Sequence, residues 1–439
     1  MIADWYIDRL QLQNFRQYEI LDIPLSKDIT LLIGENGAGK TAILDAIASL
    51  LATVLTEQKH GGKSIRHGDA RRVSSNLDSI GRLATVETHY PVVVTGTGKL
   101  AGLQFDWHRK IQTQTNQPTW GNREVREFSA HFFDGKASSH GTNGSNIFPA
   151  IAYYGVERLV GERRAQGKIP MSRVGAYHSA LDPRSDLKRV FTFLGDLDKQ
   201  IVRAQAYGDP VPHAARGQFD AIDKACTSML EPVGWHRLRW NDVIGDVTLH
   251  HNSHGTMPLA LLATGPRIAA GLAIDLASRM ARANPDLGGQ ELLNSTPGIV
   301  LIDEVDLHLH PSWQQQIVPL LRKTFPLVQF ILTTHSPQVI STVEAQCIRV
   351  LDGSGVTTPK YARGLRSNVV MELLQGVSPV PPAESRVQLN RYLAMVSEGK
   401  GHSTEALDLR EVLDREYGGS KLNQELLDTD IALSFAEWE

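Results

Sequence analysis

Residues 34–41 read GENGAGKT and lie between an apolar run at 29–33 and a segment with helical spacing of apolar residues at 42–47. They match the phosphate-binding loop pattern G-x-x-x-x-G-K-[ST] in the strand-to-helix context that the pattern requires. Glycine lets successive backbone N–H groups point into one concavity, and the start of the next helix adds positive potential suited to an anion. Lys40 would then reach the β- and γ-phosphates of a nucleoside triphosphate, and the Thr41 hydroxyl would bind Mg²⁺.

Two adjacent acids end a second apolar pattern, which reads GIVLIDE at residues 298–304 and is typical of a buried strand. Side chains alternate along a strand, so Asp303 and Glu304 project in different directions from its tip. Hydrolysis of a triphosphate needs a metal that neutralises charge on the phosphates and a base that activates the attacking water. We therefore predict that Asp303 holds Mg²⁺ together with Thr41 and that Glu304 is the general base.

A histidine follows a third buried-strand pattern, which reads VQFILTT at residues 328–334. His335 at this place can donate a hydrogen bond to the γ-phosphate or orient the attacking water. For a histidine taken alone, a structural role is the stronger alternative. The two preceding motifs favour a catalytic role for His335.

The set GENGAGKT, LIDEVDLHLHP and TTHSPQ resembles the ATPase heads of the ABC-like group, which includes structural-maintenance, recombination-mediator and overcoming-lysogenization proteins. Residues 10–16, LQLQNFR, resemble the opening strand of that group. The resemblance spans most of the chain and implies an α/β P-loop NTPase of the ABC type, with a central mixed sheet flanked by helices. It implies ATP and Mg²⁺ as cofactors, with nucleotide contacts from Arg16, Asn36, Gly37, Gly39, Lys40 and Thr41.

A narrower resemblance rests on residues 151–155, IAYYG, and on the helical tail after Arg366. These features are similar to a family of stand-alone bacterial ATPases that contains the PtuA-type subunits of Septu and retron-associated anti-phage systems. The resemblance implies a homodimer or higher oligomer that works with a separately encoded effector, most plausibly a His-Asn-His-type nuclease. Retron DNA or RNA, or a reverse transcriptase, would be further partners.

In such heads the nucleotide lies between two protomers, and the partner supplies a signature loop of the form Leu-Ser-x-Gly-x-Arg. The corresponding stretch is LATGPR at residues 262–267, ahead of a predicted helix at 268–280. Thr264 and Gly265 would face the nucleotide of the other protomer, with the helix dipole directed at its γ-phosphate. Ala263 removes the expected hydroxyl unless Thr264 replaces it, so we expect slow turnover. The alternative is an alanine-rich core helix with a proline start.

Composition and length favour a cytoplasmic protein with no membrane segment. The 439 residues suggest about two to three domains, and the two cysteines are too few for a disulfide framework. The start lacks a secretory pattern, and no segment approaches the roughly 18 apolar residues that span a bilayer. A formal net charge of −3 confines any DNA contact to a local surface.

The spread of the motifs predicts an ABC-type ATPase head at residues 1–375 and a helical tail for oligomerisation or partner binding at 376–439. Within the head we expect an outer β lobe at about 86–155 and a short helical insertion at about 184–232. The stretches 112–146 and 284–297 are expected to be polar loops. For the tail, a helical cap packed on its own head is the alternative.

A possible nucleic-acid face lies at residues 235–240, WHRLRW, where strand alternation would place Trp235, Arg237 and Arg239 on one side. Solvated charge is the alternative for these residues. The histidines at 250–254 indicate a hairpin loop rather than a metal or nuclease site.

The sequence therefore predicts an ATP-binding, slowly hydrolysing ATPase that dimerises around nucleotide and regulates an effector nuclease in anti-phage defence. A DNA-repair ATPase of the recombination-mediator kind is one alternative. A regulatory scaffold that binds ATP with little turnover is the other, and Ala263 favours it somewhat.

Overall fold

The computed structural model describes residues 3–55, 63–77, 83–119, 121–134, 147–157, 173–183, 187–352, 355–378, 384–421 and 423–436. The chain forms two compact units, Met1–Gly376 and Val377–Glu439, which are described separately.

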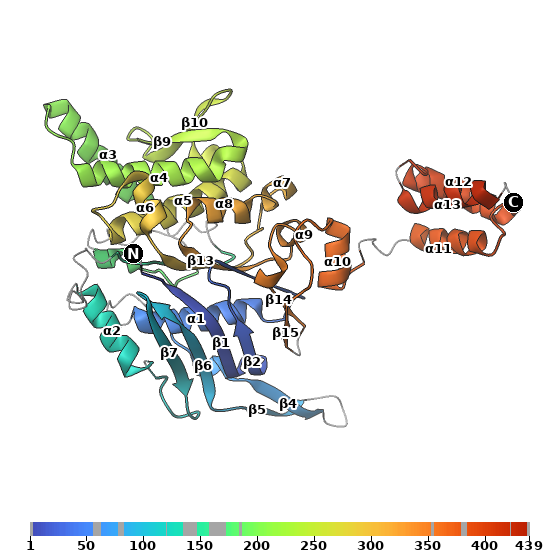
Figure 1. Cartoon of the computed structure of the whole chain (residues 1–439), viewed down its shortest axis with the longest axis horizontal. Helices are drawn as coiled ribbons and strands as arrows, with labels where there is room; N and C mark the ends of the chain where they lie inside the picture. The colour runs from blue at the N-terminus through green and yellow to red at the C-terminus, as the bar shows by residue number, and fades with distance from the viewer. Residues whose placement is uncertain are drawn as a thin grey trace. The chain divides into compact units, whose positions relative to one another are not determined.

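A six-stranded sheet lies at the centre of the first unit (Figure 1). Its order is β15 (Val356–Thr357), β14 (Ile348–Leu351), β3 (Ile29–Gly34), β13 (Val328–Thr333), β12 (Gly298–Ile302) and β8 (Ala150–Tyr154). Only β15 runs antiparallel to its neighbour, so the sheet is mixed. The carboxyl ends of β3, β12 and β13 therefore meet at one edge, where open α/β sheets bind their ligands.

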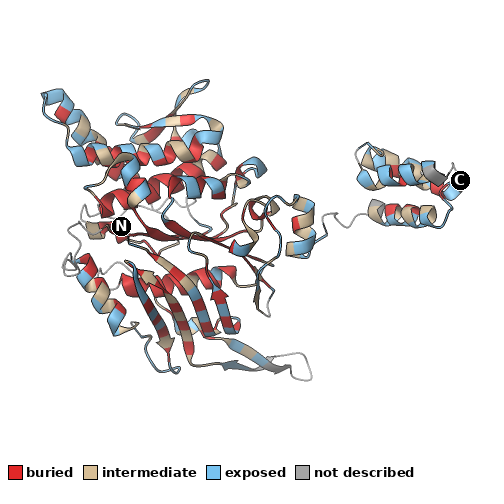
Figure 2. Cartoon of the chain, in the orientation of Figure 1, coloured by how far each residue is buried: buried red, intermediate tan, exposed pale blue. Residues whose placement is uncertain are grey.

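Both faces of this sheet are covered, because its central strands β12 and β13 are buried on both sides. All residues of β12 and β13 are buried, as the red strands in Figure 2 show. Continuous apolar runs of this kind are typical of parallel strands buried on both faces. Val300, Ile302, Phe330 and Leu332 belong to one core cluster, and Ile299, Leu301 and Ile331 belong to the other.

Helices cover one face, and a helix with an antiparallel sheet covers the other (Figure 1). The first face carries α4 (His213–Leu230), α5 (Thr264–Ala283), α6 (Gly289–Ser295) and α8 (Ile317–Thr324). The second carries α1 (Lys40–Val54) and a sheet of order β2 (Tyr18–Pro24), β1 (Tyr6–Phe15), β6 (Val92–Leu100) and β7 (Leu103–Ile111).

The first unit contains further strands and helices outside these layers. A three-stranded sheet packs on α4 and contains β9 (Trp235–Asn241), β10 (Asp246–His251) and β11 (Gly255–Pro258). Further elements are β4 (Arg72–Leu77), β5 (Leu83–Thr88), α2 (Arg123–Phe133), α3 (Leu187–Tyr207), α7 (Pro311–Gln314), α9 (Pro337–Ile340) and α10 (Ser367–Gln375). None of the described helices is long and apolar enough to cross a membrane.

The predicted fold class is confirmed, but two stretches expected to be loops contain helices. Helix α2 lies within 112–146 and buries Val125, Phe132 and Phe133 against the β1–β7 side of the core. Helix α6 lies within 284–297 and buries Leu292 and Leu293. Burial of these few apolar side chains outweighs the glycine-rich and polar local sequence. The hairpin predicted around residues 250–254 is confirmed by the pairing of β10 with β11.

The second unit contains α11 (Glu384–Ser397), α12 (Thr404–Tyr417) and α13 (Gln424–Ala436). A small core of Leu389, Tyr392, Ala406, Leu413 and Leu426 holds them together. Arg410 on α12 pairs with Asp430 on α13, and this ion pair connects the two helices.

The buried side-chain amide of Gln329 connects the antiparallel sheet to the central sheet by hydrogen bonds. Gln329 in β13 is 1% exposed and accepts a hydrogen bond from the Ile7 N–H at 2.9 Å. Its Nε2 donates to the carbonyl oxygens of Ile7 and Ser26, at 2.7 and 2.8 Å. Gln329 therefore satisfies three backbone groups, two on β1 and one in the loop before β3.

Gln329→Leu should destabilise the protein by about 3 kcal/mol, because each buried polar group left unsatisfied costs about 1–3 kcal/mol. Chemical denaturation followed by circular dichroism measures the loss. The matched control is Gln11→Leu, an exposed position on β1, which should change stability by less than about 0.5 kcal/mol. Equal stability of the two variants would contradict the fastening role of Gln329.

Candidate functional site

The loop between β3 and α1 curls because glycine occupies its left-handed positions. Gly37 has φ 85° and Gly39 has φ 90°, a region that glycine enters at little cost. A side chain at Gly39 would also lie within 1.5 Å of Gln17 Nε2, in the turn between β1 and β2. Gly39 therefore meets two demands at once, positive φ and close approach of the neighbouring turn.

Lys40 begins α1 and folds back over this loop. Its Nζ donates to the carbonyl oxygens of Gly34 and Glu35, both at 2.9 Å. Burial lowers the pKa of Lys40, and the nearby charge of Asp303 opposes that effect. Asn36 and Gly37 lie at the exposed tip of the loop. The ammonium group is thus held within the curled loop, where it can face the phosphates of a ligand.

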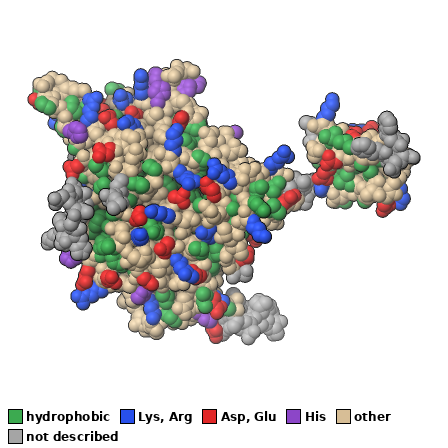
Figure 3. Space-filling view, viewed as in Figure 1, with side chains coloured by type: hydrophobic (Ala, Val, Ile, Leu, Met, Phe, Trp, Pro, Cys, Tyr) green, Lys and Arg blue, Asp and Glu red, His purple; other side chains and the backbone are tan. Residues whose placement is uncertain are grey.

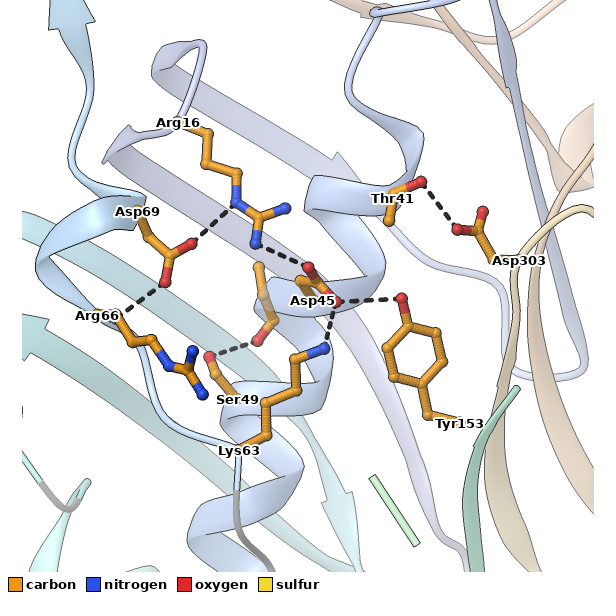
Figure 4. Close-up of polar contacts among 10 residues, drawn as sticks. Arg16, Thr41, Asp45, Ser49, Lys63, Arg66, Asp69, Tyr153 and Asp303 are labelled. Atoms are coloured by element: carbon orange, nitrogen blue, oxygen red, sulfur yellow. Dashed lines mark hydrogen bonds and ion pairs between the residues drawn. The ribbon is translucent and has the colours of Figure 1, made fainter. Parts of the chain in front are cut away.

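A chain of hydroxyl and carboxylate groups joins α1 to the ends of two strands. Thr41 Oγ1 donates to Asp303 Oδ2 at 2.8 Å, and Thr333 Oγ1 donates to Asp303 Oδ1 at 2.6 Å. The contact between Thr41 and Asp303 is drawn in Figure 4. Asp303 is 4% exposed, and its N–H donates to the Tyr154 carbonyl at 2.8 Å. The structure therefore brings together the two residues predicted to hold Mg²⁺.

Strand register explains this convergence. In the parallel pair of β12 and β13, Ile302 lies opposite Leu332, so the next residues, Asp303 and Thr333, meet at the sheet edge. Strand β3 is the other neighbour of β13, and it leads directly into the phosphate-binding loop. The site is thus assembled by strands that are distant in sequence.

Glu304 and His335 follow adjacent strands, and both are half-buried. The Glu304 N–H donates to Thr333 Oγ1 at 2.7 Å, and its φ of 48° is in the left-handed region. Such a conformation persists only where its surroundings enforce it, and it is common at functional sites. The His335 carbonyl accepts a hydrogen bond from Gln375 Nε2 at 2.7 Å. The backbones of both predicted catalytic residues are therefore fixed at the same sheet edge.

Arg16 lies in the turn after β1 and forms ion pairs with two acids (Figure 4). Its Nη2 is 2.7 Å from Asp45 Oδ2, and its Nε is 2.9 Å from Asp69 Oδ1. Burial works against the charge of Arg16, but the hydrogen bonds and charges of both acids raise its pKa. We predicted that Arg16 contacts the nucleotide. In this structure its guanidinium instead binds two carboxylates next to the loop.

Asp45 is the centre of this cluster and was not predicted from the sequence. It accepts hydrogen bonds from Arg16, from Lys63 and, at 3.1 Å, from the Tyr153 hydroxyl. Burial alone would raise the pKa of Asp45, but the hydrogen bond and charge of Lys63 and the charge of Arg16 hold it below its usual range. Asp45 follows Thr41 by one helical turn. This spacing is the only feature of the local sequence that indicates that Asp45 lies beside the site.

Strand β8 connects both covering layers to the site through neighbouring tyrosines. Side chains alternate along a strand, so Tyr153 faces α1 whereas Tyr154 faces α5. The Tyr154 hydroxyl donates to Asp275 Oδ2 at 2.7 Å, and Arg279 Nε donates to the same oxygen at 2.9 Å. The IAYYG segment therefore packs against both helices whose N-termini carry predicted site residues.

The predicted signature loop precedes α5, which begins at Thr264. Ala263 is its N-cap residue and offers no side-chain oxygen, so no side chain caps the helix. Ala263 and Thr264 are exposed, whereas Gly265 is buried. Pro266 has no N–H and the Arg267 N–H bonds the Ala263 carbonyl, so Thr264 and Gly265 carry the first-turn N–H groups that no side chain caps.

Other candidate clusters do not form a metal site. Among the residues that the structure describes, no group of three or more His, Cys, Asp or Glu side chains could hold a metal ion. Thr41 and Asp303 can hold Mg²⁺ as two protein ligands, because that ion keeps several waters and takes the rest of its oxygen ligands from phosphates. The basic residues Arg158, Arg163, Arg164 and Lys168 lie outside the described residues.

Two family models match the chain. One is described as an AAA domain and matches residues 9–207. The other is described as "AAA domain, putative AbiEii toxin, Type IV TA system" and matches residues 157–341. Together they span all the site residues described above.

Three curated relatives are each 26% identical to the chain. The "Retron Ec83 probable ATPase" of Escherichia coli aligns with 98% of this chain and 87% of its own length. The "Retron Vc95 probable ATPase" of Vibrio cholerae serotype O1 biovar El Tor aligns with 78% of this chain and 73% of its own. The "Septu protein PtuA" of Bacillus mycoides (strain KBAB4) aligns with 76% of this chain and 38% of its own.

The resemblance read from the motifs is thus confirmed by relatives that carry ATPase and Septu names. The fold, the site geometry and the matched AAA domains agree with it. The chain is an ATPase, similar to the retron ATPases and to Septu PtuA.

Proposed function

We propose that the chain binds ATP with Mg²⁺ and hydrolyses it slowly between two copies of its head. The hydrogen bond between Thr41 Oγ1 and Asp303 Oδ2, 2.8 Å long, is the observation that carries this proposal. It joins the end of the phosphate-binding loop to a buried carboxylate, the pair of oxygen ligands that P-loop ATPases offer to Mg²⁺.

The residues divide the work as follows. Backbone N–H groups of the loop and Lys40 Nζ bind the phosphates, and Lys40 exchanges its present carbonyl partners for phosphate oxygens. Thr41 and Asp303 hold Mg²⁺, which neutralises charge on the phosphates. Glu304 takes a proton from the attacking water, and His335 orients that water or donates to the γ-phosphate. Thr333 positions both acids through its hydroxyl.

The nucleotide-bound dimer is proposed from the open start of α5. Its uncapped N–H groups and the exposed Thr264 would meet the γ-phosphate held by the second copy, and Gly265 would allow the close approach. Arg16 would break its ion pair with Asp45 or Asp69 and contact the nucleotide. Ala263 offers no hydroxyl for this contact, which supports slow turnover.

We further propose that ATP-dependent closure regulates a separately encoded effector in anti-phage defence, as the retron and Septu names of the relatives suggest. The hydrogen bond from Gln375 to the His335 carbonyl supports such a link. Gln375 ends α10, directly before the second unit begins at Val377. A His-Asn-His-type nuclease is the proposed effector, with the second unit as its docking or oligomerisation surface, and retron nucleic acid or a reverse transcriptase as further partners.

Two other functions are alternatives to this proposal. A regulatory scaffold that binds ATP with little turnover is favoured by Ala263 at the cap of α5. A recombination-mediator type of DNA-repair ATPase would need turnover that DNA stimulates. Steady-state ATPase measurements with and without DNA separate them, because the scaffold shows negligible turnover and the repair enzyme a DNA-dependent rise.

Lys40→Ala should weaken ATP binding at least 100-fold, because it removes the charge that faces the β- and γ-phosphates. Isothermal titration calorimetry measures the affinity. The matched control is Lys27→Ala, an exposed lysine that pairs with Asp4, and it should bind ATP as the parent does. Parental affinity in Lys40→Ala would exclude the proposed phosphate site.

Glu304→Gln should keep ATP binding and lower turnover about 100-fold or more, as expected for loss of a general base. Because the Mg²⁺ ligands stay in place, ATP should also hold this variant as a dimer in sedimentation velocity. Glu291→Gln, an exposed acid on α6, serves as the control and should hydrolyse ATP normally. Normal hydrolysis by Glu304→Gln would remove Glu304 from the mechanism.

Ala263→Ser should raise turnover about tenfold, because one hydrogen bond to a charged group is worth about 1.5–3 kcal/mol. The new hydroxyl would also cap α5, which contributes about 1 kcal/mol to stability. Steady-state ATPase rates at several enzyme concentrations measure the effect, with Ala260→Ser, an exposed neighbour, as control. An unchanged rate at concentrations that give dimers would show that position 263 does not face the nucleotide.

A further inference from the structure

A cavity of about 680 Å³ lies on the helical side of the first unit, and it contains no residue of the ATP site. Its walls come from α4, from the turn at 231–234, and from the starts of β9 and α6 and the end of α8. The cavity is lined by three cationic side chains, Lys224, Arg237 and Lys323, together with His236 and Trp235.

A β-bulge directs Arg237 out of its strand. His250 pairs with His236 and Thr248 pairs with Arg239, so Arg237 and Leu238 together lie opposite the single residue Leu249. Arg237 adopts φ 54°, which is uncommon for a residue with a side chain and costs about 1 kcal/mol or more. Bulges of this kind re-aim side chains and occur next to functional sites.

The bulge also corrects the strand alternation expected from the sequence. Trp235 and Leu238 are both buried, at 9% and 0% exposure, although three positions separate them. Arg237 and Arg239 are exposed. Of the three residues predicted to share a face, Trp235 and Arg237 line the cavity, whereas Arg239 does not.

Both acids of the cavity already have partners in the protein. Glu231 pairs with Lys323, and Asp223 Oδ1 accepts a hydrogen bond from the Leu238 N–H at 2.6 Å. Lys224 and Arg237 have no ion pair in the part of the chain that the structure describes. Two positive charges on different elements, α4 and β9, therefore face the cavity in addition to the Lys323–Glu231 pair, and the Asp223 carboxylate is the one lining acid outside that pair.

Aromatic rings gather beside the cavity. The Trp235 and His251 ring centroids are 5.0 Å apart, and those of His251 and His254 are 4.6 Å apart. His251 Nδ1 accepts hydrogen bonds from the N–H groups of Ser253 and His254, at 3.0 and 3.3 Å, which fixes the turn. The outermost ring, His254, is exposed. In Figure 3 histidine side chains gather on the surface at the top of the view, in the region of β9 and β10.

We propose that this cavity and its ring cluster bind single-stranded nucleic acid. Lys224 and Arg237 bind successive phosphates, and the exposed His254 ring stacks on a base. Only a single strand fits both features, because a duplex hides the faces of its bases. This inference deepens the proposed partnership with nucleic acid but does not depend on ATP binding, since the two sites share no residue.

The test measures fluorescence anisotropy of a labelled (dT)12 oligonucleotide with the full chain at a series of salt concentrations. Arg237→Gly removes the guanidinium and keeps the bulge, because glycine adopts positive φ freely. Combined with Lys224→Gln, it should weaken binding at least tenfold and flatten the salt dependence by about 1.4 log units per log unit of salt, about 0.7 for each lost phosphate contact. His254→Ala should weaken binding with an unchanged salt slope.

Arg239→Ala is the matched control, since Arg239 is an exposed arginine on the same strand that does not line the cavity, and it should bind (dT)12 as the parent does. ATP titrations with all three variants should be unchanged, which separates this site from the phosphate-binding loop. The proposal is overturned if the parent does not bind (dT)12 at low salt, or if the double variant binds as tightly as the parent. It is also overturned if Arg239→Ala loses as much affinity as the double variant, or if deoxythymidine monophosphate or inorganic phosphate competes as strongly as unlabelled (dT)12.

Discussion

The two hydrogen bonds that Asp303 accepts from Thr41 and Thr333 determine how the rest of the head is arranged. A buried carboxylate is stable only where polar groups compensate its lost hydration. Here the compensation comes from the first turn of α1 and from the neighbouring strand β13. Any sequence that keeps this carboxylate buried must therefore hold the phosphate-binding loop against the ends of β12 and β13.

The covering layers are joined to that point by groups on both faces of the sheet. Tyr153 contacts Asp45 of α1, and Tyr154 contacts Asp275 of α5. One strand thus connects the helix that starts at the phosphate-binding loop with the helix that follows the predicted signature loop. Gln375 adds a third connection, from the backbone of His335 to the end of the first unit. These contacts give the protein a physical basis for transmitting a change at the nucleotide to α5 and α10.

The sequence predicted the parts of the site that are local. The phosphate-binding loop, the acidic strand end and the fold class each depend on a short run of residues whose spacing has one structural meaning. The cluster at Asp45 could not be predicted in this way, because its partner Tyr153 is 108 positions away and no pattern marks the pair. The bulge at Arg237 was missed because one inserted residue changes the face of every side chain after it, without altering the composition of the strand.

Metal binding in the presence of nucleotide tests the central assignment most directly. Electron paramagnetic resonance of Mn²⁺, used in place of Mg²⁺, measures the ion bound by the protein with a non-hydrolysable ATP analogue. Asp303→Asn keeps the size and one of the two oxygen acceptors but removes the charge, and its NH2 group faces the second threonine hydroxyl. The account predicts nucleotide-dependent Mn²⁺ binding by the parent that is weakened at least tenfold in Asp303→Asn. Equal Mn²⁺ binding by the two proteins would contradict it.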